Sequence, residues 1–161
     1  MTSTGLITMT QPSKHDTDFY TWTQEQAALL RSGRLSDIDL INLAEEVEDM
    51  GISEKRALES RLEVLIMHLL KWKYQPERRK TSHSWRKTIT EQRARIQKNL
   101  KENPGLKPLL KLQTEESKEF FLERYRFAKM SAETETGLES FPKECPFTLD
   151  QILDDEFYPG D

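Results

Sequence analysis

The chain has 161 residues, of which 35% are hydrophobic and 32% charged, and its 24 basic side chains face 28 acidic ones. This length fits one domain, no apolar run approaches the roughly 18 residues that a membrane span needs, and the first fifteen residues lack the apolar core of a secretion signal. A single cysteine, Cys145, excludes an intramolecular disulfide and fits a reducing, cytoplasmic compartment.

Residues 1–16 are polar and aperiodic, so we expect a flexible N-terminal segment followed by one helical domain over residues 17–161. The first helix is predicted to begin near Asp18, an N-cap residue type, and to end at Gly33, because glycine tolerates a positive φ. One face of this helix is apolar at about 100° per residue: it carries Phe19, Trp22, Gln26, Leu29 and Leu30.

Two further helices are predicted before the first proline of the central region. One begins at Ser36 or Asp37 and ends at Gly51, and its apolar stripe consists of Leu40, Leu43, Ala44, Val47 and Met50. The next runs from Ser53 to Pro76 and has a coiled-coil-like 4-3-4-3 spacing, the strongest periodicity in the chain, made by Leu58, Leu62, Leu65, Leu69 and Trp72.

The C-terminal half predicts a helix over residues 84–101, a long helix over residues 108–135 that bends near Thr114 and stops at Gly137, and a tail. Three prolines in the tail disfavour a long helix, but Thr148 can cap a short one through Leu153. The fold prediction is all-α: a bundle of four main helices plus a long or bent fifth helix, with the C-terminal tail packed on the bundle.

Several segments together resemble a bacterial family catalogued as domain of unknown function 29. The resemblance runs in order from Asp18 to Phe157 and covers nearly the whole chain. It is carried by DFYTWTQEQAALLRSGR (18–34), LINLAEEVEDMG (40–51), LESRLEVLIMHLLKWKYQPERR (58–79), SWRKTITEQRARI (84–96) and FPKECPFTLDQILDDEF (141–157). It implies a compact helical protein, with no activity, cofactor or catalytic residues attached.

Three polar residues at the edges of apolar stripes form a candidate polar network: Glu46, His68 and Arg93. If they converge, they make either an acid/base site or anion pocket or a buried network that fixes helix register. The register network is the commoner use of such residues. The sequence lacks the Glu-x-x-His of di-metal bundles, a nucleophile motif and a phosphate loop. No metal or cofactor is therefore expected, and enzymatic activity is a minority hypothesis.

Charge is unevenly distributed along the chain. Residues 55–111 hold 16 basic and five acidic side chains, whereas the flanking segments are acidic. This predicts a basic corner between the helices that meet near Pro76, made by Lys73, Arg78, Arg79, Lys80, Arg86 and Lys87. Its leading partner is an acidic protein or a second copy of the chain; the alternative is nucleic acid bound through residues 71–95. The commoner outcome of such segregation is that acidic helices of the same chain pack beside the basic ones and largely cancel their charge.

Overall fold

The computed structural model describes residues 12–160, and every regular element in this range is helical. This confirms the all-α class. The elements are α1 (Lys14–Thr17), α2 (Phe19–Arg31), α3 (Leu40–Tyr74), α4 (Pro76–Arg79), α5 (His83–Glu102), α6 (Glu115–Thr136) and α7 (Leu149–Leu153), with 3₁₀ turns η1 (Leu35–Asp37) and η2 (Pro104–Leu110). Within the expected flexible segment, residues 1–11 lie outside the described range, and the turn α1 begins at Lys14.

The second and third predicted helices are one continuous helix, α3, so the prediction that Gly51 ends a helix was wrong. The residues before and after Gly51 include good helix formers, and a glycine inside a helix costs only about 1 kcal/mol relative to alanine. Gly51 is not among the glycines with a positive φ, whereas Gly33 and Gly137, which do follow helices, are.

The chain divides into two compact units at Gly51. In the first unit (residues 12–51), Asp39 joins α2 to the start of α3. The Trp22 indole N–H donates to the Asp39 carboxylate at 3.1 Å, and the Asp39 backbone N–H donates to Gln26 Oε1 at 2.8 Å. Trp22 and Gln26 are buried, as their places on the predicted apolar face require.

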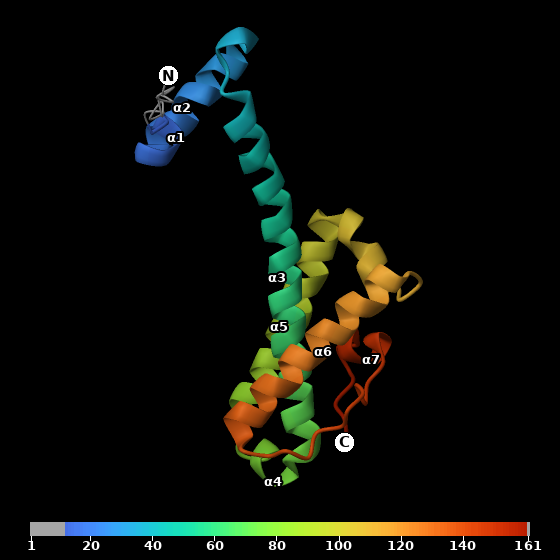
Figure 1. Cartoon of the computed structure of the whole chain (residues 1–161). Helices are drawn as coiled ribbons and strands as arrows, with labels where there is room; N and C mark the ends of the chain where they lie inside the picture. The colour runs from blue at the N-terminus through green and yellow to red at the C-terminus, as the bar shows by residue number, and fades with distance from the viewer. Residues whose placement is uncertain (1–11, 161) are drawn as a thin grey trace, which may run out of the picture. The chain divides into compact units, whose positions relative to one another are not determined.

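The second unit (residues 52–160) holds the main hydrophobic core, where α3, α5 and α6 pack side by side and the tail covers them (Figure 1). The α3 residues with the 4-3-4-3 spacing are buried, which confirms the prediction that this spacing marks a core-facing stripe. The core residues outside α3 are Trp85, Ile89 and Ile96 from α5, Phe120, Tyr125, Ala128 and Ala132 from α6, and Phe141, Phe147, Leu149 and Ile152 from the tail.

The predicted fifth helix is two elements, η2 and α6, separated by residues 111–114. Pro108 lies inside η2, and Thr114 starts α6 afresh because its side chain accepts the Ser117 N–H at 3.1 Å. Gly137 ends α6 with φ 70°, as predicted. Thr148 caps α7, also as predicted, by accepting the Gln151 N–H.

Candidate functional site

The candidate network of Glu46, His68 and Arg93 does not form as one cluster in the described part of the chain. Glu46 belongs to the first unit, where its carboxylate bonds the His15 Nε2 at 2.7 Å. His68 donates from Nδ1 to the Val64 carbonyl of its own helix at 2.8 Å. Each residue therefore has separate partners, and the arrangement supports the structural reading of these side chains better than an acid/base site.

The pKa values of His15 and His68 are shifted in opposite directions. The hydrogen bond that His15 donates to the Glu46 carboxylate raises the pKa of His15 above its ordinary 6.5, and Asp16 adds to this effect. Burial lowers the pKa of His68, because desolvation disfavours the imidazolium. His15 also lies edge-on to the Trp22 ring, with centroids 4.7 Å apart, so α1 is attached to the first unit by charge and by ring contact.

Arg93 is buried in the second unit and donates its hydrogen bonds to main-chain carbonyls of the tail. Its Nε donates to the Ile152 oxygen at 2.9 Å, and one Nη donates to the Phe157 oxygen at 2.8 Å. Longer contacts of 3.4 Å reach the carbonyls of Gln151 and Asp155. Because these acceptors lie at the end of α7 and just after it, Arg93 fixes the tail against α5.

The carboxylates that could have served a helical metal site are used by a guanidinium instead. Arg124 of α6 is buried and pairs with Glu59 at 3.2 Å and with Glu63 at 3.1 Å, both on α3. Burial raises the pKa of Glu63, while Arg124 opposes that shift. This cluster joins α6 to α3. Among residues 12–160, no group of three or more histidine, cysteine or acidic side chains is arranged to hold a metal ion.

The basic corner is partly occupied by the chain's own tail. Arg79 donates to the main-chain oxygens of Pro159 at 3.3 Å and Gly160 at 3.0 Å. The Arg86 guanidinium lies over the rings of Tyr158, at 4.2 Å, and Trp72, at 5.1 Å. These two cations hold the tail, so this part of the predicted surface has an internal role.

The other four predicted corner residues remain exposed: Lys73, Arg78, Lys80 and Lys87. Lys80 approaches Glu77 only at 3.8 Å, with both side chains largely in solvent, and such pairs contribute little. The Lys73 ammonium lies 5.6 Å from the ring of Tyr74 and equally far from that of Phe147. We call these four residues the open corner; it can attract an anionic surface without first breaking a strong ion pair.

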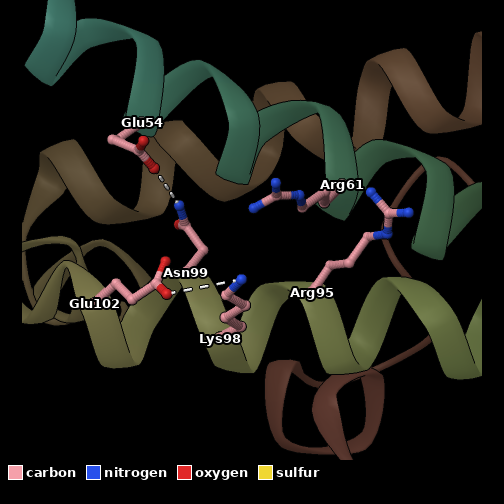
Figure 2. Close-up of a pocket in the computed structure, with 6 residues that line it drawn as sticks. All are labelled: Glu54, Arg61, Arg95, Lys98, Asn99 and Glu102. Atoms are coloured by element: carbon pink, nitrogen blue, oxygen red, sulfur yellow. Dashed lines mark hydrogen bonds and ion pairs between the residues drawn. The ribbon is translucent and has the colours of Figure 1, made fainter.

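A polar pocket between α3 and α5, with a volume of about 280 Å³, was not predicted from the sequence (Figure 2). Glu54 accepts from the side chains of Asn99, at 2.7 Å, and Asn103, at 3.2 Å. Arg95 bonds Glu91 of its own helix. The pocket is lined by Glu54, Arg61, Arg95, Lys98, Asn99 and Glu102. Most of these charged groups have a partner nearby, and the hydrogen bonds of Glu54 join α3 to the end of α5.

The first unit carries a set of large apolar side chains that are open to solvent, several of them from the apolar stripes predicted for its helices. Each is between 47 and 75% exposed, whereas the core residues of the second unit are below 9%. We call this set the N-terminal apolar row: Phe19, Tyr20, Leu30, Leu35, Leu40, Ile41, Val47 and Met50. Apolar surface of this extent on one segment is typical of an interaction site. The sequence periodicity of α3 identifies the apolar residues that this helix contributes to the row, but it does not show which surface covers them.

Neither a curated protein nor a solved structure matches the chain. Within residues 12–160, no helix is long and apolar enough to cross a membrane. One family model matches residues 15–158, nearly the whole chain, and its description is domain of unknown function DUF29. The chain therefore belongs to the DUF29 family.

Proposed function

We propose that this protein is a non-enzymatic interaction module that binds an acidic protein partner through its open corner. The observation that carries the proposal is the exposure of Arg78 and Lys87. Neither side chain has a hydrogen bond or ion pair among the described residues, although both lie beside cations that the tail has already engaged. Their positive charge is therefore available to a partner.

Charges at the rim of an interface chiefly accelerate and orient association, and they contribute less to the final affinity. An acidic partner would be drawn to the open corner and positioned there, while apolar contacts supply most of the binding free energy. On the first unit, the N-terminal apolar row offers apolar area that the described residues leave uncovered.

A protein partner is favoured over nucleic acid by the state of the aromatic rings. Single-stranded nucleic acid gains affinity when bases stack on exposed rings, but Trp72 and Trp85 are both buried. Tyr158 is already covered by Arg86. Tyr74, beside Lys73, is half-buried. The open corner therefore retains phosphate-binding cations with little ring surface beside them, and nucleic acid is an outcome of the test below.

The test compares two double variants of equal charge change by fluorescence anisotropy. A labelled Glu- and Asp-rich peptide and a labelled single-stranded oligonucleotide are titrated with the wild type, with Arg78→Glu/Lys87→Glu and with the control Lys107→Glu/Lys111→Glu. The control lysines are also exposed but lie in and after η2. Because each exposed ion pair to the peptide contributes up to about 1 kcal/mol, the corner variant should bind the peptide about tenfold or more weakly.

The control variant should keep most of the wild-type affinity, because its charges lie outside the open corner. Equal loss in both variants would mean that net charge alone attracts the peptide, which contradicts a defined site. Tighter binding of the oligonucleotide than of the peptide at near-physiological salt would replace the proposed partner class by nucleic acid.

A further inference from the structure

The N-terminal apolar row continues the same face of α3 that forms the core of the second unit. At about 100° per residue, Leu40 and Val47 point in nearly the same direction from the helix axis as Leu58 and Leu65. Leu58 and Leu65 are fully buried, whereas Leu40 is 73% and Val47 59% exposed. One helix therefore carries two apolar stretches on nearly the same face, separated by Gly51 and Glu54, and the described residues cover only the second stretch.

The two units differ in the sign of their charge. The first unit has nine acidic and three basic side chains, and residues 52–160 have 18 acidic and 21 basic ones. Three acidic residues of α3, Glu45, Glu48 and Asp49, are exposed, and their carboxylates have no hydrogen bond or ion pair among the described residues. The acidic first unit and the open corner are thus complementary surfaces present on the same chain.

We propose that the acidic partner is a second copy of this chain, whose first unit binds the open corner of its neighbour and buries the N-terminal apolar row. This inference rests on the proposed function and names its partner. Each copy supplies one acidic apolar surface and one basic surface, so two copies related by a twofold axis make the contact twice and close into a dimer.

Such a contact has the anatomy of a stable interface. The apolar side chains of α2 and α3 supply a hydrophobic centre, and the charged residues beside them supply a polar rim. A second copy also accounts for an arrangement that a lone chain does not explain. Large residues such as Leu40 and Ile41 are about three-quarters exposed, whereas the most exposed large apolar residue of α6, Met130, is 54% exposed.

The first experiment measures the mass of the full chain by sedimentation velocity from 1 to about 100 µM. The wild type should be a dimer over most of this range. The variant Leu40→Gln/Ile41→Gln/Val47→Gln should be a monomer with unchanged helix content, because the three side chains it alters are exposed. The matched control Leu122→Gln/Met130→Gln changes exposed apolar residues of α6 and should remain a dimer.

A charge exchange tests whether the first unit meets the open corner. Arg78→Glu/Lys87→Glu and Glu45→Lys/Glu48→Lys/Asp49→Lys should each weaken self-association at least tenfold, because each leaves like charges facing each other. Mixed together, the two variants can form one contact between the changed surfaces and one between the unchanged surfaces. The mixture should therefore recover more dimer than either variant alone.

The outcomes separate this inference from the proposed function. A wild type that is monomeric at all concentrations overturns the second copy as partner, and if the acidic peptide still binds the open corner, the proposed function stands. A dimer that resists the apolar triple variant, or is lost equally in the α6 control, also overturns it. So does a mixture of the charge variants that recovers no more dimer than either variant alone, because the first unit of one copy would then not meet the open corner of the other.

Discussion

Lys71, Arg93 and Arg124 are buried cations of the second unit, and each is stabilised by a different set of groups. Lys71 pairs with Glu135 at 2.5 Å and lies 4.9 Å from the Trp85 ring, while Arg124 binds two carboxylates of α3. Arg93 instead binds tail carbonyls, and burial lowers the pKa of its guanidinium below the ordinary value. Because a buried charge without partners is strongly destabilising, these three sets of contacts specify how the helices and the tail pack.

The pKa shifts of His15 and His68 predict opposite pH dependences for their contributions to folding stability. The His15 pKa is raised, so its contribution to folding is complete below pH 6.5 and is lost as the pH rises through its folded value. The His68 pKa is lowered, so its contribution is present above pH 6.5 and is lost as the pH falls through its folded value. Side-chain NMR titration should place the midpoint of His15 above 6.5 and that of His68 below it.

The variant Glu46→Gln supplies the control for that titration. It removes the carboxylate that is the largest cause of the His15 shift, so the His15 midpoint should move down toward 6.5. The His68 midpoint should stay in place, because Glu46 is not among the groups that shift it. Equal midpoints for the two histidines in the wild type would contradict the contacts described for both.

At the scale of the element, α3 shows what periodicity does and does not determine. The spacing of Leu58, Leu62, Leu65 and Leu69 correctly identified a buried helical face. The helix boundary at Gly51 could not be predicted in the same way, because a glycine is compatible both with a helix end and, at modest cost, with a helix interior. Which of these occurs depends on backbone angles that a single sequence does not reveal.

A matched pair of glycine substitutions tests the continuity of α3. Gly51→Ala should raise the free energy of unfolding by about 0.5–1 kcal/mol, because alanine is the better helix former and an added Cβ meets no atom within 4 Å. Gly137→Ala should lower it by about 1–2 kcal/mol, because the backbone there has φ 70°. Urea unfolding followed by circular dichroism measures both changes, and destabilisation by Gly51→Ala would indicate a helix end at residue 51.

A single sequence also does not show which partners the predicted site residues find in the folded chain. The sequence grouped Glu46, His68 and Arg93 as a candidate network by their places at the edges of apolar stripes, but the partners of each residue depend on the path of the chain. His15 was assigned to a flexible tail, and nothing in its sequence neighbourhood links it to a residue 31 positions away. The carbonyls that Arg93 binds are present at every residue, so no sequence signal distinguishes the tail as its partner.

At the scale of the whole molecule, the two units differ greatly in how much apolar surface they bury. Of the large apolar residues described in the first unit, Trp22 is the one below 9% exposure, whereas the second unit holds the rest of the core. Regions with few buried apolar contacts open more readily than the core. We therefore expect the two parts of α3 to differ in stability although they belong to one helix.

Hydrogen exchange measured by mass spectrometry on a dilute sample checks this expectation. Peptides from α2 and from residues 40–51 should exchange about a hundredfold or more faster than peptides from residues 58–72. Raising the protein concentration should protect the first group selectively if a second copy covers it. Uniform protection along α3 in the dilute sample would show that the first unit has a stabilising core of its own.

The way in which Arg93 and Arg79 hold the tail has a consequence for how this protein can vary. Both guanidinium groups bind main-chain oxygens between Gln151 and Gly160, and every amino acid carries such an oxygen. The side chains of exposed tail residues such as Gln151, Asp155 and Glu156 can therefore drift during evolution, or be replaced by a designer, without loss of these anchors. Insertions and deletions in that stretch will be tolerated far less than substitutions, because they shift every anchored oxygen out of register.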